Sequence, residues 1–365
     1  MCLMIGWYYH LPACASEFEV TTLVDESLQL LVDAHRDTRA KVSLAITGSL
    51  LAHIETHRPR FLASLGDAIA DAIVELVATT YHEVCPFLIP PRYLHRQITL
   101  DLQTKQHLFS IRPTAFWSGN LAWTPALPDI LSELGLHTAI IDEAHLREAH
   151  QTQLWQWLRK DSMQMDALLV DTLMSESLAH RTYRLNQSPD SALTLRILSS
   201  DLRRSLSFGT TGAVHRAWDD APLDAFITRL EETQPPTDTT CRFTGDDGDR
   251  ISPVSITQYR RLLNALGPTL ACVSDPLENA REMTLDFLPA HAPGGIDFWQ
   301  DPVAKAYGEI LTELYRAVDM GYVDEDDILP LQDVFPIFWK RIARTRWYYA
   351  RAHDLLRNTE RKPRT

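Results

Sequence analysis

Short apolar runs alternate with longer amphipathic stretches over the first two thirds of the chain. The runs have the length of buried strands and lie at residues 2–9, 41–47, 78–81, 115–117 and 137–142. Apolar residues at helical spacing fill the stretches between them, at residues 28–34, 49–55, 68–77, 97–109 and 126–134. Strands separated by helices of this length pair in parallel, with right-handed crossovers. The pattern therefore predicts an α/β domain.

The pattern changes character toward the C-terminus. Further strands are expected at residues 193–198, 241–244 and 270–273, with a helix at 259–266. So many strand–helix units in one domain favour a closed or nearly closed parallel barrel over an open sheet. After residue 295 the periodicity is helical, over 305–320 and 331–357, with no strand between. We expect a barrel over residues 1–295 and a C-terminal α-helical region over 296–365.

Composition and charge narrow the range of partners and compartments. The 365 residues are 45% hydrophobic and 23% charged, with a net charge of −13, so a globular protein with an acidic surface is expected and a nucleic-acid partner is not. No run of about eighteen uncharged apolar residues predicts a membrane span. Residues 1–12 lack the features of a secretory signal, and five cysteines without a CxxC pair fit a reducing compartment. We expect a cytoplasmic protein.

Polar residues recur directly after the predicted strands. In a parallel barrel the active site is assembled from the loops at the carboxyl ends of the strands. The residues at these positions are His10, Thr47, His82, Glu83, Asn120, Asp142, Glu143, His145, Asp201, Asp246, Asp247 and His291. Each of them alone is most simply a solvated loop residue. Their repeated position indicates a polar site at one end of the barrel.

Several of these segments resemble the motifs of glycoside hydrolase family 57, which contains amylases and 4-α-glucanotransferases. Residues 8–12, Tyr-Tyr-His-Leu-Pro, resemble the family pattern HxHQP, with His10 and Pro12 kept and the first histidine and the glutamine not kept. Residues 42–51 and 75–83 follow the second strand and the second motif of the family. Together, the motifs occur in the family's order over roughly the first 295 residues.

The third motif contains the most informative difference between this sequence and the family pattern. Residues 115–125 read Ala-Phe-Trp-Ser-Gly-Asn-Leu-Ala-Trp-Thr-Pro and are similar to the family's GFWLPE, aromatic residue and proline. The nucleophile glutamate falls on Asn120. Residues 246–250 resemble the DDGEKFG segment, which places the acid/base on Asp247, and residues 288–291 resemble the motif that lines the sugar subsites.

This resemblance implies a distorted, TIM-like (β/α)7-type barrel that binds an oligosaccharide or α-glucan, without a cofactor or metal. The residues that it assigns to substrate binding are His10, Glu83, Trp117, Trp123, Asp142 and His291. Retaining enzymes need two carboxylates roughly 5–5.5 Å apart, one to attack the anomeric carbon and one to protonate the leaving oxygen. The amide of Asn120 is neutral and weakly nucleophilic, so double displacement should be lost even though Asp247 keeps a proton donor.

Three hypotheses follow for the function. The first is a barrel that binds glycan with little or no turnover. The second is an active hydrolase or transferase with a rearranged site, in which Asp247 acts with Asp142, Glu143 or Glu83. An inverting mechanism of this kind has a carboxylate spacing of about 6.5–9.5 Å. The third is a metal-dependent, deacetylase-like hydrolase that uses His10, His82 or His145 with Asp142. The sequence fixes neither the sugar nor the oligomeric state.

Two other features have simpler explanations. His53 and His57 are four residues apart on a predicted helix and could share a metal ion, but a solvated helix face explains them better. The aromatic and arginine residues at 339–351 fit helix packing over the barrel better than nucleic-acid binding, because the chain is acidic.

Overall fold

The computed structural model describes residues 2–118, 122–142, 155–160, 163–170, 241–247, 259–261, 263–264, 270–275, 281–283, 302–333 and 342–360. The strand expected at residues 193–198 lies outside these ranges. So do Asn120, Glu143, His145, Asp201 and His291.

The first sheet is built around the N-terminal strand. β1 (Cys2–Tyr9) lies between β2 (Val42–Ile46) and β8 (Cys241–Asp247), and β3 (Val74–Val77) pairs with the far edge of β2. All of these pairs are parallel, and β9 (Leu270–Ala271) pairs with the beginning of β1 in the same direction. Trp7, Tyr8 and Tyr9 of β1 point alternately to its two faces and are all buried, as expected for a strand inside a parallel sheet.

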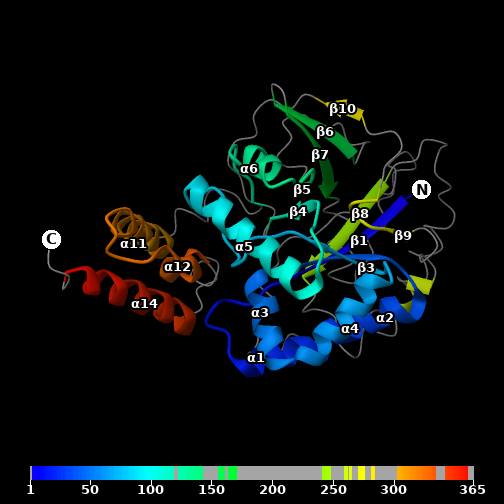
Figure 1. Ribbon diagram of the computed structural model, residues 1–365, viewed down its shortest axis with the longest axis horizontal. Helices are drawn as coiled ribbons and strands as arrows, with labels where there is room; N and C mark the ends of the chain where they lie inside the picture. Colours follow the sequence, from blue (N-terminus) through cyan, green and yellow to red (C-terminus); the bar gives the residue numbers. More distant parts are fainter. Residues whose placement is uncertain are drawn as a thin grey trace.

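The second sheet continues the first. Its order is β10 (Arg281–Met283), β6 (Trp155–Lys160), β7 (Met163–Val170), β5 (Thr138–Asp142) and β4 (Ala115–Trp117). A parallel bridge between Ala78 and Phe116 connects the end of β3 to β4, and residues of β7 also contact β8 (Figure 1). The predicted α/β class with parallel strands is confirmed. The antiparallel β6–β7 hairpin was not predicted.

Helices follow the strands along the chain and pack against the two sheets. In chain order they are α1 (Glu17–Leu23), the π-helical η1 (Val24–Leu28), α2 (Gln29–Thr38), α3 (Gly48–His57), α4 (Pro59–Ala70), α5 (Pro91–Phe109) and α6 (Leu127–Glu133). Residues typical of helix N-termini begin several of these helices. Ser16 and Glu19 form a capping box at α1, and prolines occupy the first turns of α4 and α5. Figure 1 shows α1 to α4 on one side of β1 to β3.

One helix prediction was wrong. Residues 68–77 were expected to be helical, but α4 ends at Ala70, the chain turns at Ala72 with φ 55°, and Val74–Val77 form β3. Nearly every residue of this stretch is apolar, so its pattern does not distinguish one face of a helix from a buried strand. The β-branched valines at both ends of β3 favour the strand.

The C-terminal helices share a hydrophobic core with α5. They are α11 (Pro302–Asp319), α12 (Glu325–Ile328), the 3-10 turn η7 (Leu329–Gln332) and α14 (Ile342–Glu360). Tyr93 of α5 stacks on Tyr315 of α11 at 4.6 Å between ring centroids, and Tyr307 and Tyr348 belong to the same buried cluster. The expected continuous helix over 331–357 was wrong at its beginning, because Pro330 starts a 3-10 turn and Asp333 is extended.

A buried chain of side-chain hydrogen bonds fixes the outer face of β1. The Trp7 indole donates to the Tyr259 hydroxyl (2.9 Å), which lies 2.7 Å from Nε2 of His35, and Nδ1 of His35 lies 2.8 Å from the carbonyl oxygen of Ala40. Burial lowers the pKa of His35 to about 4. The imidazole is therefore neutral, with Nδ1 donating to Ala40 and Nε2 accepting from Tyr259. This chain holds α2 and the helical residues 259–261 against β1.

Gly48, at the beginning of α3, is expected to tolerate no side chain. A Cβ at this position would lie 2.5 Å from Cδ2 of Tyr81 and 3.2 Å from Cα of Asp101. We expect Gly48→Ala to lower the free energy of unfolding by about 1–3 kcal/mol, measured by urea denaturation. Gly308→Ala in α11 is the control, because nothing lies within 4 Å of its added Cβ. Equal stability of the two variants would contradict the prediction.

Candidate functional site

The described strand ends bring polar and aromatic residues to one edge of the sheet. His10 follows β1, Thr47 follows β2, His82 and Glu83 follow β3, and Trp117 is the last residue of β4. The strands are parallel, so these positions meet at the same end of the sheet. All five residues are buried.

His10 lies between two buried carboxylates. Its Nε2 is 3.4 Å from Oε2 of Glu83 and 3.3 Å from Oδ2 of Asp333, and all three side chains are almost completely buried. The hydroxyl of Tyr348 donates to Oδ2 of Asp333 at 3.1 Å. The two His10 contacts have ion-pairing distances without hydrogen-bond geometry. Within the described residues, both ring nitrogens of His10 therefore keep their capacity to bond a ligand.

Other buried polar atoms nearby have no hydrogen-bond partner among the described residues. They are Oγ1 of Thr47, Oγ of Ser49, Nδ1 of His82 and Oδ1 of Asp333. A buried polar group without a partner costs about 1–3 kcal/mol, so a cluster of such groups indicates a place where a polar ligand binds. Burial first, and then the neighbouring imidazoles of His10 and His53, lower the pKa of His82 to about 3. His82 is therefore neutral and can both donate and accept.

An aromatic contact spans the first and fourth strands. The rings of Tyr8 and Trp117 meet edge to face at 5.4 Å between centroids, and Tyr8 is the register partner of Asp247, the last residue of β8. Trp123 is 4% exposed and belongs to the hydrophobic cluster that also contains Phe116 of β4 and residues of α5. Its assignment to sugar binding stays a prediction.

Gln97 on α5 joins two segments of the site. Its side-chain oxygen accepts from the backbone N–H of His82 at 2.9 Å, and its side-chain nitrogen donates to the carbonyl oxygen of Leu329 at 3.1 Å and to Oε1 of Gln332 at 2.8 Å. The loop that carries His82 and Glu83 is thereby tied to the segment that ends in Asp333.

A sequence model described as glycosyl hydrolase family 57 matches residues 17–264. The chain belongs to glycosyl hydrolase family 57. It is 28% identical over 147 residues to an alpha-amylase of Pyrococcus horikoshii, a match that covers 40% of this chain and 23% of that protein.

Solved structures of family 57 enzymes share the fold. A branching enzyme of P. horikoshii has a TM-score of 0.69 at 9% identity over 97% of this chain and 88% of its own. An alpha-amylase of Thermotoga maritima has a TM-score of 0.68 at 12% identity, covering 98% and 93%. A 4-alpha-glucanotransferase of Thermococcus litoralis has a TM-score of 0.61 at 16% identity, and the match covers 87% of this chain but 46% of that enzyme.

The sequence-predicted site residues of this family 57 chain fall into three groups. His10, Glu83 and Trp117 have described side chains at the strand ends. Asp142 ends β5 and Asp247 ends β8, and only their backbones are described. Asn120 and His291 lie outside the described residues. The roles of all three groups stay predictions.

Sequence reasoning missed Asp333 and its partner Tyr348. Both residues lay within a stretch that was interpreted as one long helix. The signal was Gln332-Asp333 in an otherwise apolar run between Pro330 and Pro336. Two prolines argue against a continuous helix, and a polar pair in an apolar run needs buried partners.

Two further features of the described residues concern groups of metal ligands and helices that could cross a membrane. No three or more of their histidine, cysteine, aspartate or glutamate side chains are grouped to hold a metal ion. The predicted centre combines His10, His82 or His145 with Asp142, and the side chains of Asp142 and His145 are not described. His53 and His57 share a face of α3 with ring centroids 6.4 Å apart. In the described part of the chain no helix combines the length and apolarity that a membrane crossing requires.

Proposed function

We propose that this family 57 chain binds an α-glucan or a related oligosaccharide at the carboxyl ends of its strands, and that it lacks retaining glycosidase activity. The buried imidazole of His10 between Glu83 and Asp333 carries the proposal. Together with Thr47 and His82, it offers a ligand hydrogen-bond donors and acceptors in a buried setting. Sugar hydroxyls match such groups, because each hydroxyl both donates and accepts.

We further propose that the strands close into the distorted (β/α)7 barrel, with residues 1–295 forming the barrel and 296–365 the helical region. The order β8-β1-β2-β3-β4-β5-β7 and the contact of β7 with β8 support closure. Because Asp333 and Tyr348 reach His10, the helical region would complete the site rather than stand apart from it.

The proposed chemistry places Asn120 and Asp247 in one cleft. Trp117 lies three residues before Asn120 and contacts Tyr8, whose register partner is Asp247. These contacts support the placement of both residues at the same end of the barrel. Asp247 could then protonate a leaving oxygen, but the Asn120 amide could not form the glycosyl ester.

A rearranged active site is the second candidate, and the position of Glu83 favours it. Glu83 is a buried carboxylate at a strand end, and it could activate water opposite Asp247 in an inverting mechanism. In that case the wild-type chain hydrolyses malto-oligosaccharides, and both Glu83→Gln and Asp247→Asn abolish hydrolysis. Turnover that survives either change would exclude this pair.

Calorimetric titration with maltoheptaose tests the binding proposal. We expect wild-type binding without release of reducing ends, and we expect His10→Ala to weaken the affinity by about tenfold or more, because two buried hydrogen-bonding nitrogens are lost. His137→Ala, at an exposed histidine before β5, is the matched control and should bind like wild type. An absence of wild-type binding, or equal affinities of the two variants, would refute the proposal.

A further inference from the structure

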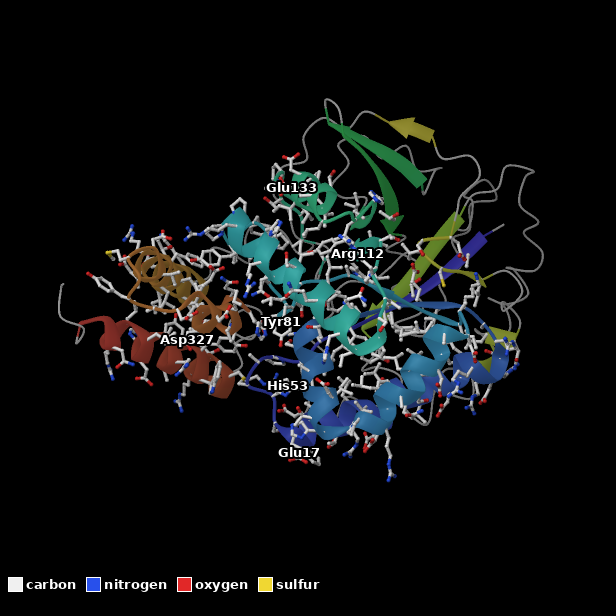
Figure 2. All side chains as sticks on the ribbon, viewed as in Figure 1. Glu17, His53, Tyr81, Arg112, Glu133 and Asp327 are labelled. Atoms are coloured by element: carbon white, nitrogen blue, oxygen red, sulfur yellow. The ribbon has the colours of Figure 1, made fainter. Side chains whose placement is uncertain are left out.

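A second hollow lies outside the strand-end site, against the helical layer. It is a groove of about 1190 Å³ between α3, α5, the α12–η7 segment and α14, and we call it the α3–α5 groove. Figure 2 shows His53, Tyr81 and Asp327 around this region, where the helices of the first sheet face the C-terminal helices. His82 lies at the junction of the groove and the strand-end site.

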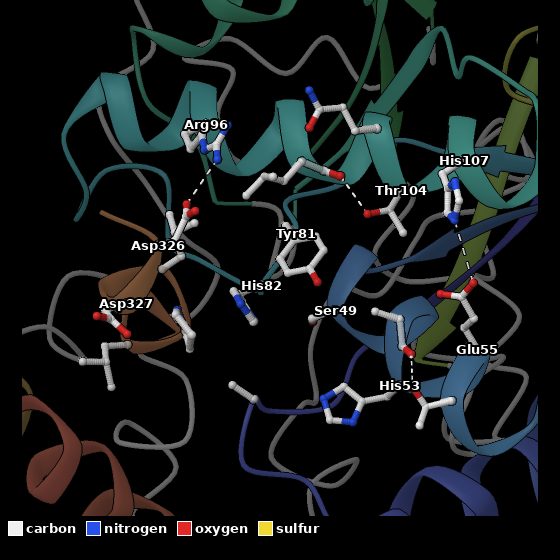
Figure 3. A pocket seen from close by; sticks show the side chains of 18 of the residues that line it. Ser49, His53, Glu55, Tyr81, His82, Arg96, Thr104, His107, Asp326 and Asp327 are labelled. Atoms are coloured by element: carbon white, nitrogen blue, oxygen red, sulfur yellow. Dashed lines mark hydrogen bonds and ion pairs between the residues drawn. The ribbon is translucent and has the colours of Figure 1, made fainter. Parts of the chain in front are cut away.

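Tyr81 and His82 form a fixed floor at the centre of the groove (Figure 3). The Tyr81 ring packs against Gly48 and meets the His82 ring edge to face at 4.9 Å. Burial raises the pKa of Tyr81, so its hydroxyl stays a hydrogen-bond donor. The beginning of α3, which carries Ser49, is held by a bond from the Ser49 N–H to the carbonyl oxygen of Tyr81 at 2.8 Å.

Two residues of the groove carry a buried polar atom without a hydrogen-bond partner among the described residues. The atoms are Oγ of Ser49, whose residue is 3% exposed, and Nδ1 of His82, whose residue is 7% exposed. Both belong to the rigid floor. A ligand with hydroxyl groups would relieve the cost of leaving them unpaired.

Most of the charged residues of the walls form ion pairs, and Oε1 of Glu55 lies 3.9 Å from Nε2 of His107. Arg96 on α5 pairs with Asp326 at 3.1 Å, and Arg351 on α14 pairs with Asp327 at 3.3 Å. Burial, and then the neighbouring His57, lower the pKa of His53, which keeps its imidazole neutral. A groove with paired charges and neutral donors and acceptors suits an uncharged ligand better than an anion or a cation.

The remaining walls offer groups suited to a sugar. The hydroxyls of Thr56 and Thr104 donate to carbonyl oxygens of their own helices, so their oxygens still accept. Trp347 of α14 is 39% exposed at the rim, and an indole face packs well against the apolar face of a sugar ring. The volume exceeds the range of about 300–1,000 Å³ that is typical of small-ligand pockets, so several sugar rings would fit.

We propose that the α3–α5 groove is a second oligosaccharide-binding site, which adjoins the strand-end site at Ser49 and His82. It would hold a neutral glucan chain against Trp347, with Ser49, Tyr81 and His82 bonding its hydroxyls. Only the choice of malto-oligosaccharides as the probe rests on the proposed function. The groove would let the chain remain attached to a polymer while another segment occupies the strand ends.

Matched pairs of variants test the groove. Trp347→Ala is compared with Phe18→Ala, which removes an exposed aromatic residue on α1, and Gln103→Ala is compared with Gln106→Ala on the same helix. Maltoheptaose is titrated into the full chain with a chelator present, so that a metal on His53 and His57 cannot contribute. We expect Trp347→Ala to weaken the groove binding by about tenfold and Gln103→Ala to weaken it severalfold, with both controls unchanged.

Each titration is repeated in the His10→Ala background to separate the two sites. If the strand-end site fails to bind, His10→Ala changes nothing while Trp347→Ala still lowers the affinity, and the groove proposal stands alone. If His10→Ala removes all binding and Trp347→Ala removes none, the groove proposal is overturned. The indole N–H resonance of Trp347, assigned with Trp347→Phe, should shift on titration. If Trp347→Ala unfolds at the same temperature as wild type, its loss of affinity for maltoheptaose is not caused by unfolding.

Discussion

Asn120→Glu is expected to give the chain retaining activity on malto-oligosaccharides, with turnover about 10³-fold or more above wild type. The change supplies a charged carboxylate that can attack the anomeric carbon and leave again when water arrives. The glutamate side chain is also one methylene longer than that of asparagine. Reducing-end release from maltoheptaose measures the rate, and mass spectrometry detects the covalent glycosyl intermediate that double displacement requires.

Two further variants separate charge from length. Asn120→Gln has the length of glutamate without its charge, and it should remain inactive. Adding Asp247→Asn to Asn120→Glu should remove the gained activity, since the leaving oxygen then has no proton donor. If Asn120→Glu binds maltoheptaose but does not cleave it, the two carboxylates are not at the spacing of about 5–5.5 Å that retention needs. If neither wild type nor variant binds, the family likeness extends to the fold alone.

The strands that the sequence predicted best are those with sharp boundaries. Residues 2–9 and 115–117 were predicted as strands and form β1 and β4, because polar or turn-forming residues follow both apolar runs directly. β3 was misplaced because only Asp71 interrupts the apolar residues between the last turn of α4 and β3, and one polar residue is equally compatible with a continuing helix. The β6–β7 hairpin was missed although the sequence carries a signal for it: Trp155-Gln-Trp157 and Met163-Gln-Met165 alternate apolar and polar residues on either side of Asp161-Ser162.

The part of the site that follows strands could be predicted, and the part that depends on distant packing could not. His10, Glu83 and Trp117 follow or end parallel strands, so topology alone places them at one edge. Asp333 reaches His10 only because the C-terminal helices share a core with α5. No local pattern near residue 333 indicates a contact with residue 10.

The loop after β3 depends on a buried ion pair, and this dependence leads to the second large expected effect. Asp101 and Lys105 lie four residues apart on α5, with both side chains 0% exposed and Nζ 2.6 Å from Oδ2. Asp101 also accepts from the backbone N–H of Thr79 at 2.9 Å and from its hydroxyl at 3.1 Å. Burial raises the pKa of Asp101 and lowers that of Lys105, while the pairing opposes both shifts. The pair therefore holds the backbone two residues before Tyr81.

Lys105→Met should lower the free energy of unfolding by about 3–5 kcal/mol, because it leaves a buried carboxylate without its cation. A domain of ordinary stability has about 5–15 kcal/mol, so the variant should unfold at far lower urea concentration. The raised pKa of Asp101 gives the sign of the pH dependence. Its folded pKa lies above its unfolded value, so the folded variant takes up a proton first and should become relatively more stable as pH falls from 7 to 5.

Two comparisons distinguish a buried unpaired charge from the mere loss of a long side chain. Asp101→Asn combined with Lys105→Met removes both charges, keeps an acceptor for Thr79, and should recover much of the lost stability and abolish the pH dependence. Arg316→Met on α11 removes an exposed member of the pair with Glu313 and should change stability by less than about 1 kcal/mol. A double variant no more stable than Lys105→Met would mean that packing around the lysine stem, not charge pairing, holds the loop of His82 and Glu83.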